Sequence, residues 1–186
     1  MSAFHRPGPG EHASYYRRYI DLVPEGDILD ILRDQLGETL ALLQQVPLER
    51  EGHRYAPGKW SIREVVGHLL DTERVFAYRS LTMARSDGAD LPGMDQEEWA
   101  RNSNAAARSL DDLAAEWAGV RRASLHLFGT LPEEAAGRTG RASGYDFTVR
   151  SFPWIIAGHE LWHRERLRTD YLGGGDGAGG GDSDAG

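Results

Sequence analysis

Apolar residues recur at spacings of three and four along four segments of the chain. These segments run over residues 27–46, 61–86, 110–128 and 149–171, and Pro47 ends the first of them. Such spacing places the apolar side chains on one face of a helix. The pattern therefore predicts four long amphipathic helices, and these favour an all-α fold, a four-helix bundle.

Each predicted helix has its own apolar stripe. Ser61 and Glu64 form a capping-box pattern at the start of the second helix, and Pro153 is tolerated in the fourth only within its first turn. The four stripes are Ile28, Leu32, Leu36, Leu40 and Leu43; Ile62, Val65, Leu69, Thr72, Phe76 and Met83; Leu113, Trp117, Val120, Ser124 and Phe128; and Phe152, Ile156, His159, His163 and Leu167.

The segments between the helices are predicted to be loops. A short helix is expected over residues 95–101, and no alternation long enough to indicate a strand is present. Residues 1–14, with a Pro/Gly cluster, are expected to be a flexible N-terminus, and the Gly/Asp-rich residues 173–186 a disordered tail. A single domain over residues 15–172 remains.

Composition excludes several classes of protein. The 29 acidic residues outnumber the 21 lysines and arginines, and a net charge of −8 argues against nucleic-acid binding. The absence of cysteine excludes disulfides, thiolate zinc sites, iron–sulfur clusters and a cysteine nucleophile. No apolar run approaches the roughly 18 residues of a membrane span, and residues 1–19 lack the features of a secretory signal. We therefore expect a cytoplasmic protein with no membrane or nucleic-acid partner.

Two histidines lie on the apolar face of the fourth helix. His159 and His163 are four residues apart, so their side chains stack about one turn from each other. A buried imidazole must satisfy both of its nitrogens, and a lone core histidine usually does so with hydrogen bonds. Two at this spacing favour a divalent metal, which binds one nitrogen of each ring.

The string from His159 to His163 also matches the H-E-x-x-H motif of zinc proteases. The protease hypothesis is disfavoured because the glycine tail begins within ten residues of His163, and because Arg166 and Thr169 stand where the extended motif has Gly and His. No segment is a candidate for the strand beside the substrate cleft. A third metal ligand is therefore expected upstream.

His68, at the edge of the stripe of the second helix, is the best candidate for that third ligand. Three imidazoles leave coordination positions open, whereas structural zinc sites are usually closed by four protein ligands. A set of His68, His159 and His163 thus favours binding or activation of water or substrate. Without a thiolate, the metal is zinc, nickel, iron or manganese.

At these residues the sequence resembles a known family. The stretch YAPGKWSIREVVGHLLD (55–71) resembles the "GKWS…EvlgHl.d.E" signature of the DinB-like (damage-inducible) superfamily, and IIAGHELWH (155–163) resembles its C-terminal H-x-x-x-H helix. The resemblance covers about residues 27–171, with both motifs in the expected order. It implies an up-down-down-up four-helix bundle, often a homodimer, with a metal held by His68, His159 and His163. Relatives include thiol-dependent enzymes, namely bacillithiol transferases and mycothiol-dependent maleylpyruvate isomerase, and metal hydrolases.

Two reactions on a small-molecule substrate follow from an open metal site. A low-molecular-weight thiol or a water molecule would bind the metal and ionise more readily there. Glu160 is a weak candidate for a catalytic base, because it points about 100° around the helix from His159. Asp71 and Glu73 are candidates for contacts behind the ligands, and an ion-paired role is the alternative for each.

Other residues near the site have simpler explanations. Arg164, Arg166 and Arg168 suit the negative end of the fourth helix, and binding an anionic thiol or acid substrate is their alternative role. Trp60, Trp154 and Trp162 are expected in the core or at a dimer contact. Two other hypotheses stay open: a metal-binding stress-response module without turnover, and a bundle whose histidines are hydrogen-bonded and bind no metal.

Overall fold

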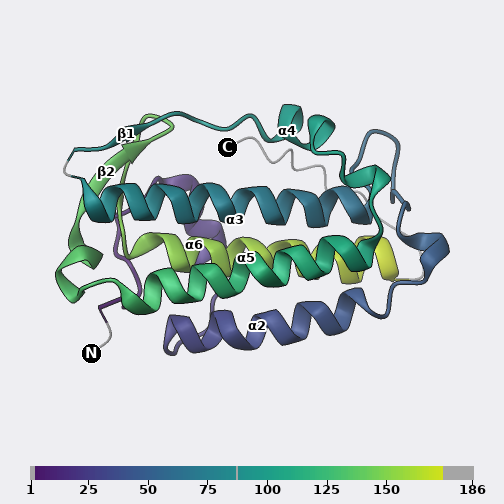
Figure 1. The fold of residues 1–186 in the computed structure, drawn as a ribbon, viewed down its shortest axis with the longest axis horizontal. Helices are drawn as coiled ribbons and strands as arrows, with labels where there is room; N and C mark the ends of the chain where they lie inside the picture. The colour runs from purple at the N-terminus through teal and green to yellow at the C-terminus, as the bar shows by residue number, and fades with distance from the viewer. Residues whose placement is uncertain (1–2, 87, 174–186) are drawn as a thin grey trace.

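The computed structural model describes residues 3–86 and 88–173 and contains the four predicted long helices (Figure 1). Helices α2 and α6 run in one direction and α3 and α5 in the other, so the bundle has the predicted up-down-down-up arrangement. No helix among the described residues has the length and apolar character needed to cross a bilayer. The four helices are α2 (Ile28–Leu43), α3 (Ile62–Arg85), α5 (Leu110–Thr130) and α6 (Ser151–Arg166).

The helix starts follow the local sequence. Asp27, Ser61 and Ser109 cap α2, α3 and α5 by accepting hydrogen bonds from backbone amides of the first turn. The predicted capping box is present, because the Glu64 carboxylate also accepts from the Ser61 amide at 2.7 Å. Pro153 lies in the first turn of α6, where the backbone amide that proline lacks has no partner within the helix.

Short helical elements connect the bundle. The predicted helix over 95–101 is confirmed as α4 (Gln96–Asn102), capped by Asp95. Near the N-terminus, η1 (Ser14–Tyr16) leads into α1 (Arg17–Ile20), and a π-helix, η5 (Leu167–Leu172), continues α6. The remaining 3-10 turns are η2 (Leu48–Arg50), η3 (Ala105–Ala107) and η4 (Glu133–Gly137).

The structure also contains three short strands, which no pattern in the sequence indicated. Strands β1 (Asp90–Leu91), β2 (Thr139–Ala142) and β3 (Tyr145–Thr148) form a small sheet at one end of the bundle (Figure 1). β1 pairs with β2 in parallel, and β2 pairs with β3 in antiparallel orientation. Strands of two to four residues are too short to show an alternating pattern. Ser143 and Gly144, both with positive φ, form the two-residue turn of the hairpin.

The N-terminal segment packs on the bundle where composition predicted a flexible segment. Phe4 is buried, and its carbonyl accepts a hydrogen bond of 2.8 Å from the Trp154 indole. Arg6 donates to the carbonyls of Ile20 and Val23. Hydrogen bonds from side chains to backbone carbonyls, together with the buried Phe4 ring, therefore hold this segment despite its glycines and prolines. Of the predicted disordered tail, residues 174–186 lie outside the described part of the chain.

The inner face of α2 is more polar than its predicted stripe. Leu36 and Leu40 are only half-buried, whereas Gln35 and Thr39 are fully buried. Gln35 donates to the Ala157 carbonyl at 3.2 Å, and the Thr39 hydroxyl donates to Glu160. These two bonds attach α2 to α6, which is buried on nearly every side from Ser151 to Glu160.

An ion cluster at the centre of the bundle joins all four helices. The guanidinium of Arg121 on α5 is completely buried and pairs with Glu73 on α3 and Glu160 on α6, both at 2.9 Å. It also donates to the Leu32 carbonyl on α2 at 3.1 Å. Burial disfavours the Arg121 charge, but the two carboxylates outweigh burial and raise its pKa. The buried apolar residues form two separate groups, and on each helix the ion cluster lies between them. The ion cluster therefore divides the core into two halves.

Helix α1 approaches α6 closely at a glycine. A Cβ at Gly158 would overlap the backbone carbonyl of Tyr19, so α1 can lie in this position only because residue 158 has no side chain. This contact places Tyr19 beside the ring of His159, with 5.4 Å between ring centroids.

We expect Gly158→Ala to destabilise the protein by about 2 kcal/mol, because the obstructing atom is backbone and the helices must move apart. Gly119→Ala is the matched control: Gly119 lies on an exposed face of α5 with no atom near its Cβ position. The control should gain up to about 1 kcal/mol from helix propensity. Urea unfolding followed by circular dichroism measures both, and equal stabilities would contradict the close contact.

Replacing Arg121 by Met should cost about 3–5 kcal/mol of unfolding free energy, because two buried carboxylates lose their cation. Arg122→Met is the control, since Arg122 is exposed, and should change stability by less than about 0.5 kcal/mol. Thermal and urea unfolding provide the measurement. A loss for Arg121→Met no larger than that of the control would show that the cluster is not structurally required.

Candidate metal centre

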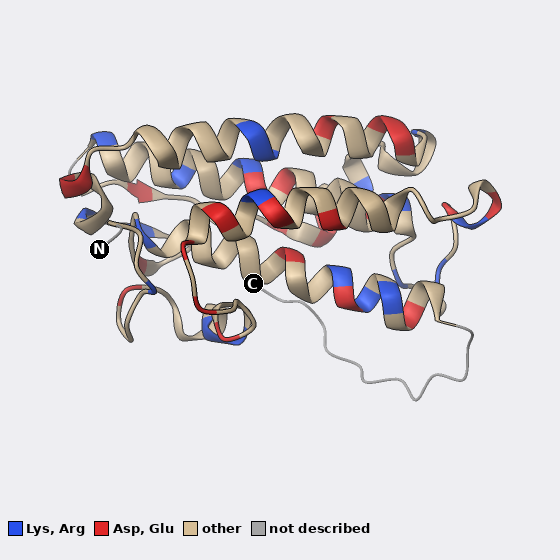
Figure 2. Cartoon of the chain, turned by 90° about the horizontal axis from the view of Figure 1, so that it is seen from below, with Lys and Arg blue, Asp and Glu red and all other residues tan. Residues whose placement is uncertain are grey.

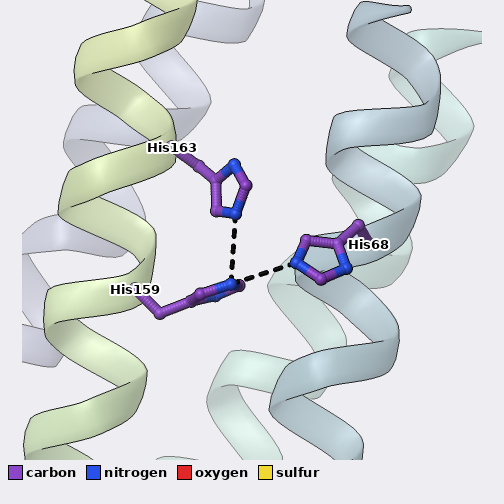
Figure 3. A group of neighbouring side chains, drawn as sticks. All are labelled: His68, His159 and His163. Carbon is purple, nitrogen blue, oxygen red and sulfur yellow. Dashed lines mark hydrogen bonds between the residues drawn. The ribbon is translucent and has the colours of Figure 1, made fainter. Parts of the chain in front are cut away.

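The structure brings the three predicted histidines together in the interior of the bundle (Figure 3). His68 comes from α3, and His159 and His163 come from successive turns of α6. The Nε2 atom of His159 lies 3.0 Å from Nε2 of His68 and 3.1 Å from Nε2 of His163. All three side chains are at least nine-tenths buried. One nitrogen of each ring thus converges on a common point.

Ordinary hydrogen bonding does not account for this arrangement. An imidazole nitrogen carries either one hydrogen or one lone pair, so it makes one well-aligned hydrogen bond in the plane of the ring. Here the same nitrogen of His159 faces two other ring nitrogens at hydrogen-bond distance. An ion placed among the rings would use one lone pair from each histidine, which fits the donor set.

The spacing of the nitrogens is consistent with a shared ion. Two histidine nitrogens bound at 2.0–2.1 Å lie about 2.9 Å apart when their bonds are at right angles, and about 3.3 Å apart at the tetrahedral angle. The two observed separations fall between these values, and the three candidate ligand atoms all lie within 4.8 Å of one another. The three histidines therefore fit a divalent metal.

Neighbouring side chains fix the orientation of the three rings. An aromatic ring packs on each: Trp60 on His68 at 4.7 Å, Tyr19 on His159 at 5.4 Å and Trp162 on His163 at 4.7 Å. The Thr72 hydroxyl lies 3.3 Å from Nδ1 of His68. With Nε2 facing a metal, Nδ1 carries the hydrogen and donates it to this hydroxyl, which selects the ligating tautomer.

The electrostatic environment disfavours the charged forms of His68 and His163. Burial, followed by the charge of His159, lowers the pKa of His68 well below its usual value. Burial lowers the pKa of His163 as well, and the charges of the other two histidines, Arg166 and Arg18 add to the effect. The neutral imidazole is the form that binds metal, so these lowered pKa values favour metal binding.

A pocket of about 150 Å³ opens beside His163. It lies where the loop before α3 meets the end of α6 and η5. Its walls are the aromatic residues Tyr55, Trp60, Trp162 and Tyr171, with Lys59, Arg166 and Glu97 supplying charge. A small molecule in this pocket would thus lie against a candidate metal ligand.

The carboxylates predicted near the site have structural partners. Glu160, the candidate base, pairs with Arg121 and accepts from Thr39, and it does not line the pocket. Glu73 pairs with the same arginine, and Asp71 lies 3.9 Å from Arg74. A cavity of about 10 Å³, room for one water, separates His159 from this ion cluster. Glu73 and Glu160 therefore lie behind the histidines, on the opposite side from the pocket.

Several residues at the site were not predicted as functional. Arg121 was not singled out, and Glu73 and Glu160 were predicted only as a contact behind the ligands and a weak candidate base. All three occupy core-facing positions, and three charges at such positions were a signal of a buried ion cluster. Trp60 and Trp162 line the pocket instead of the core, while Trp154 is in the core as expected. Three further pocket residues lie outside the predicted apolar stripes, so helical periodicity did not indicate them. Tyr55 and Lys59 come from the loop before α3, and Tyr171 comes from the π-helix η5.

Comparisons with known proteins agree with this geometry. The family model of the DinB superfamily matches residues 31–167. A protein of Oceanobacillus iheyensis named "Putative metal-dependent hydrolase" is 33% identical over 73 residues, which span 39% of this chain and only 40% of that protein. The solved structure of YfiT from Bacillus subtilis, described as "a probable metal-dependent hydrolase with an unusual four-helix bundle topology", superposes with a TM-score of 0.64 at 15% identity. The superposition covers 88% of this chain and 90% of YfiT.

The likeness to YfiT shows the fold alone, because the identity is low. The family match is broader evidence, since it takes in most of the four helices and all three histidines. On this ground the chain belongs to the DinB superfamily.

Proposed function

We propose that the protein is a divalent-metal-dependent enzyme whose metal is held by His68, His159 and His163, and that it acts as a hydrolase on a small-molecule substrate. The single observation that carries the proposal is the convergence of three buried imidazoles, directly beside an open pocket. The names given to the relatives in Oceanobacillus iheyensis and Bacillus subtilis support the same class.

Each part of the site has a role in this proposal. A bound divalent ion would polarise the substrate and lower the pKa of a water or thiol nucleophile. Thr72 and the rings of Trp60, Tyr19 and Trp162 hold the imidazoles in position. A substrate bound between the aromatic walls would displace water from the metal, which would strengthen the electrostatic interactions there.

A second candidate is transfer of a low-molecular-weight thiol. Glu97, which is exposed, is the one carboxylate that lines the pocket within the described residues, and Glu73 and Glu160 are paired with Arg121. A thiol ionises far more readily than water, so it needs less help from a base. Since the chain has no cysteine, the sulfur would come from the co-substrate.

A metal-binding stress-response module without turnover is the alternative outside catalysis. Such a module would bury its metal without access, and the pocket beside His163 argues for access instead. Homodimer formation and a cytoplasmic location remain predictions from the family resemblance and the composition.

Reconstitution with zinc, nickel, iron or manganese should load about one ion per chain, measured by elemental mass spectrometry after desalting. His68→Ala, His159→Ala and His163→Ala should each lose the ion, and Thr72→Val should weaken binding about tenfold by freeing the His68 tautomer. The exposed His126 supplies the control, because His126→Ala should load like the wild type. A protein that retains none of the four metals would contradict the site.

The metal-loaded protein should hydrolyse members of a panel of small esters and amides, and a chelator should abolish the activity until metal is restored. His163→Ala should lower kcat/KM about 1,000-fold, since metal polarisation supplies several kcal/mol. The same panel is run with electrophiles and low-molecular-weight thiols. Turnover only with a thiol would identify the transferase, and a bound metal without any turnover would identify the binding module.

A further inference from the structure

The pocket beside His163 contains the chain's only lysine. All other strong bases in the sequence are arginines, and Lys59 forms part of the pocket wall in the loop before α3. It is half-buried and makes no ion pair with any residue in the described ranges. A half-buried lysine without a carboxylate partner, on the wall of a pocket, favours an anionic ligand.

Arg166 adds a second cation with donors to spare. Its two polar contacts, with the Tyr55 hydroxyl at 3.4 Å and the Asp170 carboxylate at 2.9 Å, both use Nη2. Nε and Nη1 make no hydrogen bond with the described part of the chain. Asp170 thus holds the guanidinium in place while two of its nitrogens stay available to a ligand, and a guanidinium suits a carboxylate well.

The local charge of the pocket differs from that of the whole protein. The net charge of the chain is −8, yet basic residues gather at the end of α6 (Figure 2). Arg18, on α1, adds a further cation close to His163: it donates to the Tyr19 hydroxyl at 2.9 Å and disfavours a charge on the histidine. Glu97 is the opposing charge of the pocket wall, and it lies exposed at the rim, where it accepts from the Trp60 indole at 3.3 Å.

The walls determine the shape of ligand that fits. Four aromatic side chains surround the pocket, and Tyr171 packs edge-on against Tyr55 with 4.9 Å between centroids. The Tyr171 hydroxyl donates to the Trp60 carbonyl at 2.8 Å, so three of the four walls are linked. Aromatic surfaces held in this way suit the flat face of a ring or a conjugated chain. The volume of about 150 Å³ is below that of pockets for drug-sized ligands, so the group must be small.

We propose that this pocket binds a small, flat carboxylate, with the anionic group on Lys59 and Arg166 and the flat part against the rings of Trp60 and Trp162. The inference names the substrate class of the site described under the proposed function, and it rests on that function for its catalytic meaning. Binding itself is a property of the pocket and can be measured separately.

Isothermal titration of the metal-loaded protein with three probes tests the proposal. Benzoate is flat and anionic, benzamide is flat and neutral, and cyclohexanecarboxylate is anionic but not flat. Benzoate should bind about tenfold more tightly than benzamide, as expected when charged hydrogen bonds are lost, and clearly more tightly than cyclohexanecarboxylate. Equal affinity for benzoate and benzamide would overturn the proposal, as would equal affinity for the two carboxylates.

Matched variants locate the binding groups. Lys59→Gln and Arg166→Gln should each weaken benzoate about tenfold and change benzamide less than twofold. Arg168→Gln is the control, because Arg168 is exposed in η5, two residues after Arg166, and lies outside this pocket. A loss for Arg168→Gln as large as that for the other two would indicate a general charge effect and would overturn the assignment.

A second readout needs no variant. Because the chain has one lysine, acylation of the ε-amine followed by mass spectrometry reports on this pocket alone. Benzoate should protect Lys59 from acylation and benzamide should not. If protection is found but no metal-dependent turnover, the ligand class stands and the proposed function fails. If turnover is found and protection is absent, the proposed function stands and the ligand class fails.

Discussion

The buried pairing of Arg121 with Glu73 and Glu160 is the interaction on which the rest of the bundle depends. Removing charges from water is costly, and the cost is tolerated only when every partner is in place. Here one guanidinium reaches carboxylates on two helices and a carbonyl on a third. A shift of any helix along its axis would break these bonds, so the cluster sets the register of the bundle.

This register also positions the histidines. Glu73 follows His68 by five residues on α3, and Glu160 is next to His159 on α6, so the cluster joins the two helices that carry the candidate ligands. Nε2 of His159 lies 3.0 Å from that of His68 and 3.1 Å from that of His163 because the helices are fixed just behind the rings. The stability of the bundle and the geometry of the site therefore depend on the same contacts.

The two sides of the histidine cluster differ in chemistry. Behind it are the ion cluster and a cavity with room for one water, and in front is a pocket with aromatic walls and cationic groups. Helix α1 covers a third side. It lies close to α6 because Gly158 has no side chain, and this places Tyr19 against His159. The three sides together hold the ligands in place, and the pocket gives a small molecule an approach past His163.

The four helices, the capping box of α3 and the three histidines could be predicted from the sequence, because periodicity, capping and i, i+4 spacing are local properties of the chain. The family signature added the order of the helices. Only the tertiary structure showed the short strands, the polar inner face of α2 at Gln35 and Thr39, and the packing of residues 3–14. The structure also showed that Glu160, a candidate base in the sequence, pairs with Arg121, and that Lys59 lines a pocket. The reason is physical: these features are made by contacts between residues far apart in the chain, and no local pattern encodes which of them meet.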